Sequence, residues 1–222
     1  MDGDGWRTRG AGERGGAANT ASVPARRRVP AAERREALIS AAVHEFARGG
    51  LQGTAVERIA RRVGVAQPYV FSLFANKREL FLAALERSFN EVADAFRGAA
   101  SEFREGRAPS ECADALDAMG HAYKALLTKD RDYLMLQHQC YAACGDDELV
   151  RARVRHRYAG LVALARELSG ATPERLDDFF RHGMALNVAA ALGLEELSVS
   201  CDWAAAELTQ PELAGCVQAV SG

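Results

Sequence analysis

The sequence predicts an all-α protein, with an N-terminal three-helix helix-turn-helix domain and a C-terminal helical domain. From about residue 31 onward, apolar residues recur three and four positions apart, as in Ile39, Val43 and Phe46, which is the spacing of one helix face. Capping residues and glycines separate these stretches, and no segment alternates apolar and polar residues as a strand does. A chain of 222 residues is long enough to bury a sizeable core.

The composition is that of an ordinary globular protein, with 48% hydrophobic and 26% charged residues. No apolar run approaches the roughly 18–20 residues that a membrane helix needs. The opening MDGDGWRTRG lacks the apolar centre of a secretion signal. We therefore expect a cytoplasmic protein without a membrane partner. The five cysteines lie in helix-like apolar stretches, so reduced thiols are expected; they are Cys112, Cys140, Cys144, Cys201 and Cys216.

Charge is divided unevenly along the chain. Residues 1–85 carry 14 basic and 8 acidic residues, a net charge of +6, and the remainder carries 14 and 22, a net charge of −8. A basic head joined to an acidic body is typical of a protein whose head binds nucleic acid. The alternative is chance clustering of arginines.

Residues 1–30 are expected to form a disordered basic arm. They contain six glycines, six arginines and few large apolar side chains, so they bury too little surface to offset the entropy of folding. The run 26–28 consists of three arginines just before the first helix. It either reaches along a DNA groove or its phosphates, as other basic arms do, or forms a solvated tail.

Residues 31–78 are predicted to form the helix-turn-helix domain. The first helix is expected to end at Gly49 and Gly50. Thr54 and Glu57 have the spacing of a capping box, in which each side chain accepts a hydrogen bond from the backbone N–H of the other residue. This pair predicts the start of a second, short helix.

Gly64 ends the second helix, and a third helix is expected at about 66–74. Pro68 lies in its first turn, where proline is tolerated because the missing N–H has no partner there. Asn76 and Glu79 then repeat the pattern of a cap followed by a glutamate, which predicts the start of a long helix.

The third helix is the candidate recognition helix, because the second helix of a helix-turn-helix enters the major groove. Val70 and Phe74 are four residues apart and are expected to face the core. Gln67 is expected to face outward, where its amide can donate to and accept from a base edge. Tyr69 can donate to a phosphate or pack on a thymine methyl group.

Three more side chains are expected on the outer surface of this region. Ser72 and Leu73 project outward from the third helix, and Lys77 opens the next helix, where its ammonium suits a phosphate. The alternative is that these helices form a small hairpin inside an unrelated α-domain, since a generic helix-turn-helix pattern is weak evidence alone.

Residues 34–85 resemble the DNA-binding domain of the TetR family of transcription regulators. The C-terminal helices fit that family by number and length only. The resemblance covers about 50 of the 222 residues. It is carried by the Phe46 helix end, Gly50, Thr54, Ile59-Ala60, Gly64-Val65, Gln67-Pro68-Tyr69, Phe74 and Asn76-Lys77-x-x-Leu80.

The resemblance implies a DNA-binding transcriptional regulator, specifically a repressor that a small-molecule effector releases from its operator. It implies a homodimer that places one recognition helix on each half of a near-palindromic stretch of double-stranded DNA. The positions implied to contact DNA are Thr54, Gln67, Pro68, Tyr69, Phe71, Ser72, Leu73 and Lys77.

Three positions depart from the family pattern. Phe71 lacks the hydroxyl of the usual tyrosine, and Ala66 cannot cap the helix as the frequent serine does. Leu73 is apolar where many relatives carry a hydrogen-bonding residue. We therefore expect more apolar contact and more readout of DNA shape than is usual in the family.

Residues 79–222 are predicted to form a helical ligand-binding and dimerisation domain. The long helix that begins at Asn76 carries an apolar stripe at Phe81, Leu85, Phe89, Val92 and Phe96. Further helices are expected at about 110–126, 131–144, 147–168, 173–195 and 202–219.

The helix at 173–195 is apolar over a broad face and needs a partner. We expect it to pack against its two-fold mate, with a neighbouring helix from each subunit, as a four-helix bundle. Ordinary packing within the chain is the alternative. The candidate interface residues are Phe179, Phe180, Met184, Asn187 and Val188.

A ligand cavity is expected among soft or polar-tipped side chains, which line many small-molecule pockets. Plain core packing is the alternative for each of them. Because the histidines and cysteines lack metal-ligand spacing, no metal and no cofactor are expected. The candidate cavity residues are Met119, Tyr123, Met135, His138, Gln139 and Tyr141.

No enzymatic activity is expected, because the sequence has no nucleotide-binding glycine loop, no nucleophile elbow and no plausible pair of catalytic carboxylates. A nearer alternative is an activator or architectural protein of the same fold that binds DNA without an effector. An apolar cavity near Tyr123 and His138 would favour the ligand-responsive protein, and a solid core would favour the alternative.

Overall fold

The computed structural model describes residues 30–193, which form eight helices and no strand, and so confirms the all-α fold class. The expected basic arm, apart from Pro30, and the expected helix at 202–219 lie outside the described residues. No helix in the described range is long and apolar enough to cross a membrane. The helices are α1 (Ala31–Gly53), α2 (Val56–Val63), α3 (Gln67–Leu73), α4 (Lys77–Arg104), α5 (Ala115–Lys129), α6 (Arg131–Ala143), α7 (Glu148–Ser169) and α8 (Pro173–Leu192).

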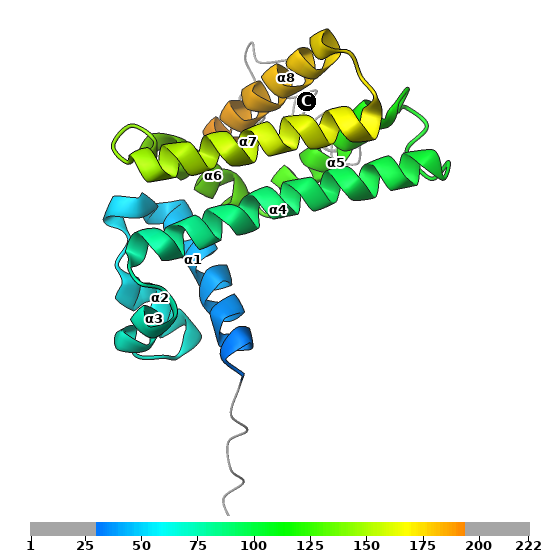
Figure 1. Cartoon of the computed structure of the whole chain (residues 1–222). Helices are drawn as coiled ribbons and strands as arrows, with labels where there is room; N and C mark the ends of the chain where they lie inside the picture. The colour runs from blue at the N-terminus through cyan, green and yellow to red at the C-terminus, as the bar shows by residue number, and fades with distance from the viewer. Residues whose placement is uncertain (1–29, 194–222) are drawn as a thin grey trace, which may run out of the picture.

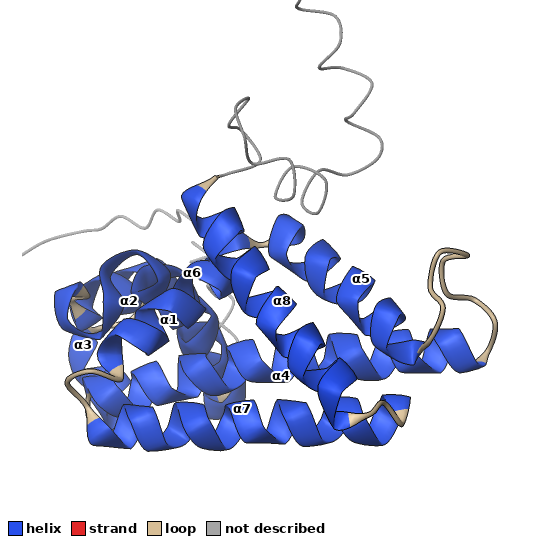
Figure 2. Cartoon of the chain, turned by 90° about the horizontal axis from the view of Figure 1, so that it is seen from above, coloured by secondary structure: helices blue, strands red, loops and turns tan. Residues whose placement is uncertain are grey.

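The helices form a small head and a larger body (Figure 1). α2 and α3 pack beside α1 beneath one end of the body, and α4 runs from this head along the body beside α7. Figure 2 shows α5 and α8 side by side, lying across α4 and α7. The expected domain boundary at residue 78 falls in the first turn of α4, so the head and the body share that helix.

The core of the head is built from aromatic and aliphatic side chains of α1, α3 and α4. Phe46 meets Phe81 edge to face, with 5.0 Å between ring centroids. Val70 and Phe74 of the α3 region are each 1% exposed, as their four-residue spacing predicts. The guanidinium of Arg35 lies over the Phe74 ring, 4.8 Å from its centroid.

The predicted cap of α4 by Asn76 is confirmed, and Glu79 accepts from the residue before the cap instead of from Asn76 itself. The Glu79 N–H donates to Asn76 Oδ1 at 2.9 Å, and the Ala75 N–H donates to Glu79 Oε2 at 2.6 Å. These bonds satisfy backbone donors that the helix itself leaves without partners. The fourth helix therefore begins where its sequence predicts.

The capping box predicted at Thr54 is wrong. Ala55 occupies the N-cap of α2, and no side chain caps that helix. Thr54 is instead 2% exposed, and its hydroxyl donates to the carbonyl of Glu45 at 3.1 Å. The chain passes so close to α1 that a Cβ at Gly49 would lie 2.6 Å from Thr54 Oγ1. The Thr54 hydroxyl therefore bonds to α1 and does not cap the start of α2.

The apolar stripe predicted for α4 is confirmed, since its five members are all buried. The helix expected from about residue 110 begins later, at Ala115, with Cys112 outside it. Asp114 sets this start, because its side chain accepts from the Asp117 N–H at 2.8 Å as an N-cap. The remaining helices of the body begin and end within three residues of the predicted bounds.

Gly50 breaks the helical backbone of α1, which confirms the predicted end at this glycine pair, although a further short helical stretch follows it. Its φ of 61° and ψ of −174° lie in a region that only glycine adopts readily, and the helix then continues to Gly53. α6 also passes close here, because a Cβ at Gly50 would lie 2.5 Å from Gln139 Oε1. Glycine thus permits the bend that brings the end of α1 against α6.

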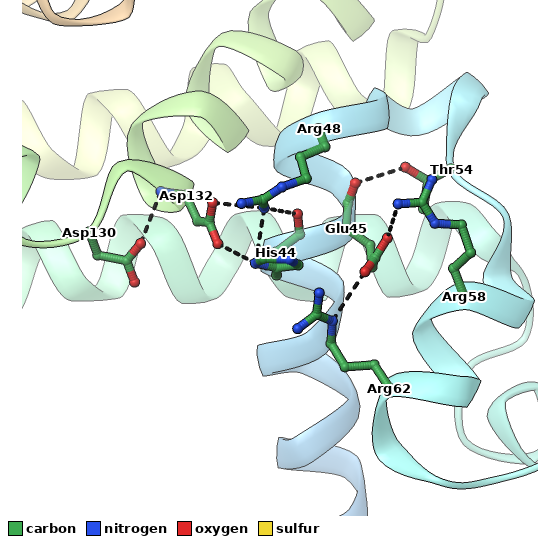
Figure 3. Close-up of polar contacts among 8 residues, drawn as sticks. All are labelled: His44, Glu45, Arg48, Thr54, Arg58, Arg62, Asp130 and Asp132. Atoms are coloured by element: carbon green, nitrogen blue, oxygen red, sulfur yellow. Dashed lines mark hydrogen bonds and ion pairs between the residues drawn. The ribbon is translucent and has the colours of Figure 1, made fainter.

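Charged side chains join the head to α6. Asp132 of α6 accepts at Oδ2 from His44 Nδ1, at 2.6 Å, and at Oδ1 from Arg48 Nη1, at 2.8 Å (Figure 3). At the other end of α6, Arg78 of α4 lies 2.6 Å from a carboxylate oxygen of Asp147, the N-cap residue of α7. These contacts connect the head to the body at two separate places.

Replacing Gly50 with alanine should destabilise the protein. Because an L side chain is strained at this φ and ψ, the Gly50→Ala variant should lose about 2 kcal/mol of free energy of unfolding, measured by urea denaturation. Gly53→Ala is the matched control, since nothing lies within 4 Å of a Cβ there. Equal stability of the two variants would show that the bend at Gly50 does not need a glycine.

Candidate nucleic-acid interface and ligand cavity

The outer surface of α3 is the candidate nucleic-acid interface. This helix lies in the head, at the far side of the molecule from α8 (Figure 1). Val70 packs its inner face into the core of the head, and both apolar and polar side chains of the helix face outward. Tyr69 is 36% exposed and Phe71 is 42% exposed, which is high for aromatic residues. The predicted contact residues that lie on this surface are Gln67, Pro68, Tyr69, Phe71 and Ser72.

A buried carboxylate holds α2, and with it α3, in place on α1. Glu45 is only 5% exposed, and it pairs with two arginines of α2 (Figure 3). Arg58 Nη2 lies 2.8 Å from Glu45 Oε2, and Arg62 Nε donates to Oε1 at 3.1 Å. A buried carboxylate is costly without partners, so these pairs fix the position of α2 along α1. Sequence reasoning did not identify Glu45, because its partners lie in another helix.

Three of the predicted contact residues are placed differently from the expectation. Thr54 is buried, so its side chain does not face DNA. Leu73 is half-buried and packs against the core instead of projecting outward. Lys77 does not point freely into solvent, because its ammonium donates to the carbonyls of Gln52, at 3.0 Å, and Thr54, at 3.3 Å. These carbonyls lie at the end of α1, where a cation is favoured.

A cavity of about 370 Å³ lies in the body, which is within the range of about 300–1,000 Å³ that drug-sized ligands occupy. Side chains of α4, α5, α6, α7 and α8 contribute to its wall. Of the six predicted cavity residues, only Tyr123 lines it. Four residues predicted for the dimer interface line it as well, namely Phe179, Phe180, Met184 and Asn187.

The other predicted cavity residues lie elsewhere in the body. Met119 is fully buried in the core, and Gln139 faces α1 at Gly50. Met135 packs against the core, and His138 Nε2 lies 3.0 Å from the carbonyl oxygen of Asn187. Tyr141 is bonded to residues of the wall but is not part of it.

The sequence does contain a signal for the face of α5 that lines the cavity. Asp117, Gly120, His121 and Lys124 recur at helical spacing and all contribute to the wall. This face mixes polar residues with a glycine. Leu116 and Tyr123 of the same helix also border the cavity, whereas Met119 is fully buried against neighbouring helices.

Neutral polar groups form a connected network at the cavity wall. Tyr123 Oη donates to Asn187 Oδ1 at 2.6 Å and lies 3.3 Å from Gln137 Oε1. Gln137 Nε2 donates to Tyr141 Oη at 2.7 Å, and Tyr141 Oη in turn lies 3.6 Å from Met184 Sδ. Burial raises the pKa of Tyr123 to about 12, so its phenol remains protonated at neutral pH. The network therefore offers hydrogen bonds without an ionised group.

The outer face of α8 carries exposed apolar side chains at four-residue spacing. Met184 is 40% exposed, Val188 51% and Leu192 67%. Asn187 is only 2% exposed and is bonded to Tyr123, so the prediction that it faces a partner subunit is wrong. Phe179 and Phe180 are half-buried, and their rings pack on one another and on residues of the cavity wall.

One thiol and one imidazole lie together beside the cavity. Cys112 Sγ is 3.5 Å from His121 Nδ1, a pairing that can activate a nucleophile when the thiol is acidic. Here burial, and then Asp117 and two further carboxylates, raise the pKa of the Cys112 thiol. This shift disfavours the thiolate, which is the nucleophilic form of cysteine. Cys140 and Cys144 are also free thiols, and residues 30–193 include no cluster of ligands suited to a metal ion.

Comparisons with known proteins match the head of this chain. Residues 38–84 fit the family model described as bacterial regulatory proteins, tetR family. The HTH-type transcriptional activator FasR of Mycolicibacterium smegmatis is 36% identical over 72 residues, which are 32% of this chain and 33% of that protein. The HTH-type transcriptional repressor SCO4008 of Streptomyces coelicolor is 36% identical over 56 residues, which are 25% and 29% of the two chains.

The likeness in sequence thus covers about a third of the length of these curated relatives. The likeness in fold is broader. A solved structure of a TetR family member from Streptomyces coelicolor has a TM-score of 0.61 and 19% identity, over 79% of this chain and 96% of that one. At this identity the match concerns the fold alone. Over residues 38–84, the chain is therefore similar to the bacterial regulatory proteins of the tetR family.

Proposed function

We propose that the protein is a transcriptional regulator that binds duplex DNA as a homodimer and responds to a small molecule held in the cavity of its body. The observation that carries the proposal is the outward surface of α3, a short helix braced by buried contacts and presenting exposed side chains. A helix presented in this way can enter a major groove, which is about 12 Å wide.

Within this proposal, α3 reads DNA by a mixture of polar and apolar contacts. Gln67 can pair with a base edge, and Phe71 can pack on a thymine methyl group or on a sugar. The Tyr69 hydroxyl can donate to a phosphate. The Ser72 hydroxyl already donates to the carbonyl of Tyr69, at 2.7 Å, so it meets DNA as an acceptor. Lys77 positions the start of α4 and contributes positive charge.

Dimerisation through α8 is the second part of the proposal. A single helix of seven residues covers few base pairs, so a near-palindromic site needs two copies of the head. The apolar stripe formed by Met184, Val188 and Leu192 suits a second copy of the same helix, because a two-fold axis places identical stripes face to face. Two copies of α8, each with a neighbouring helix, would form a four-helix bundle.

Two helices support coupling between the cavity and the head. α4 begins at the head with Lys77 and contributes Val92 and Phe96 to the cavity wall. α6 contributes Gln137 to the wall and contacts α1 through Asp132. A ligand that shifts either helix would move α3, so we propose that it releases a repressor from DNA. An effector-independent activator or architectural protein is the alternative, and the cavity favours the ligand-responsive form.

No catalytic step enters this proposal. The protonated Cys112 thiol supports a binding role over a nucleophilic one. We place the protein in the cytoplasm, where a regulator of this kind meets chromosomal DNA.

Gln67→Ala should relax sequence specificity. On duplexes that the wild-type protein selects from a random library, the variant should lose about 1–3 kcal/mol of binding free energy, roughly 5- to 150-fold in affinity, with the loss confined to one base pair of each half-site. Gel-shift titrations against single-base variants of the selected duplex measure this. Lys129→Ala, which removes an exposed charge at the end of α5, is the control. Unchanged specificity of the Gln67 variant would remove this residue from the interface.

Val188→Glu should separate the subunits. Burying two unpaired carboxylates at a two-fold seam should raise the dimer dissociation constant at least about 100-fold, and weaken binding to the full DNA site. Sedimentation velocity over a range of protein concentrations measures the dissociation constant. Leu149→Glu places the same charge at another exposed aliphatic position and should leave the dimer intact. If both variants remain dimers of wild-type affinity, the stripe on α8 is not the interface.

A further inference from the structure

The cavity wall shows what chemical class of molecule it can hold. We propose that the cavity takes an uncharged, largely aromatic or otherwise apolar molecule bearing one hydrogen-bond acceptor, such as a ketone, which points to the amides of Gln137 and Asn187. This inference rests on the proposed function only in treating the cavity as a ligand site. It adds the class of the ligand, which neither the fold nor the DNA interface determines.

Five aromatic rings form a continuous surface in and beside the cavity. The Phe96 ring lies 6.4 Å from Tyr123 and 5.7 Å from Phe179, between centroids. Phe179 lies 5.2 Å from Phe180, which lies 5.5 Å from Tyr158. All four contacts are edge to face, so ring edges cover part of the faces that would hold a cation. The wall therefore favours contact with an apolar or aromatic surface.

The polar network of the wall retains the capacity to donate a hydrogen bond to a ligand. Gln137 Nε2 carries two N–H groups and gives one to Tyr141. Asn187 Nδ2 also carries two, and the hydrogen bond that it donates to Gln137 Oε1 is long at 3.4 Å. The Tyr123 hydroxyl hydrogen is already given to Asn187. A ligand group here is therefore best an acceptor, such as a carbonyl oxygen.

The ionisable residues of the wall do not favour a charged ligand. They lie on exposed or half-exposed side chains and include both signs, with Glu111 and Asp117 against Lys124. Asp117 is already paired with Arg175 at 3.3 Å. A charged group placed among the rings would lose its water without gaining a buried counter-charge, which is costly.

Two glycines leave space against the rings. A Cβ at Gly120 of α5 would lie 3.6 Å from Phe179 Cε2, and a Cβ at Gly183 of α8 would lie 3.8 Å from Tyr123 Cε1. Both distances are ordinary van der Waals contacts, so a small side chain fits either position without a clash. A larger side chain at these positions would occupy the cavity that a ligand needs.

The test uses matched fluorescent probes with the full-length protein. N-phenylnaphthylamine and anilinonaphthalenesulfonate share their rings and differ by a sulfonate, and diphenylhexatriene and its trimethylammonium derivative differ by a cation. In each pair, the neutral probe should bind at least about 10-fold more tightly, which corresponds to about 1.4 kcal/mol. Gly120→Leu should abolish the site, with Gly183→Leu as a second cavity-filling variant and Gly98→Leu, in open space on α4, as the control.

The acceptor is tested with propionyl-dimethylaminonaphthalene, a neutral ketone. Gln137→Met keeps the side-chain shape but removes the amide, and it should raise the dissociation constant of the ketone about 5-fold, the effect of one hydrogen bond. The affinity for N-phenylnaphthylamine, which has no carbonyl, should change less than about twofold. Gln139→Met, on the same helix but facing α1, should change neither affinity.

Two results would overturn the inference. The first is that a charged probe binds as tightly as its neutral partner, or more tightly, at a site that the Gly120→Leu substitution removes. The second is that no probe shows saturable binding that this substitution removes. Gel-shift titrations with the same variants test the proposed function separately from the proposed ligand class. If the neutral probes bind as expected but leave DNA affinity unchanged, the ligand class stands and the coupling of the cavity to DNA binding fails. If Gly120→Leu still binds DNA, loss of probe binding is not due to unfolding.

Discussion

The position of α3, the proposed DNA-binding helix, depends on how α1 is held, because α1 contacts both α2 and α6. Neighbouring residues of α1 make these two sets of contacts. Glu45 buries its carboxylate against two arginines of α2, while His44 reaches Asp132 of α6 (Figure 3). Because an unpaired buried carboxylate is costly, α2 cannot slide along α1 without breaking both of its ion pairs. The head is thus joined to the body by the shared helix α4, by packing between α1 and α6, and by the polar contacts of His44 and Arg48 with Asp132.

The cavity lies among helices that also reach the head, and the proposed coupling of the cavity to α3 rests on this arrangement. Packed helices move as units because their interiors are close-packed, so a ligand that displaces one end of α4 or α6 is felt at the other. The bend at Gly50 matters for the same reason, since it lets the end of α1 lie against α6. The cavity wall combines rings with a neutral network at Tyr123 and Gln137, and the proposed ligand class follows from this combination of shape and one hydrogen bond.

Local sequence signals predicted the parts of the fold that depend on neighbours along the chain. The Asn76 cap formed as expected, and Val70 and Phe74 face the core, because both signals act within one turn of helix. The signal at Thr54 failed because a carbonyl of α1 competes for the same hydroxyl. Lys77 is likewise drawn to carbonyls 23 and 25 residues away in the chain. A short stretch of sequence does not reveal such competition, because the competing carbonyl groups belong to residues far away in the chain.

The sequence alone determined the helical class of the protein, the place of its helix-turn-helix and most of its helix bounds, because periodicity, caps and glycines act locally. Only the tertiary structure decided which face of each helix borders the cavity and which borders the core. The mixed face around Gly120 is open while the apolar face of Met119 is filled, and Asn187 turns inward to Tyr123. The physical reason is that a helix presents several faces of similar composition, and its neighbours determine which face each one covers.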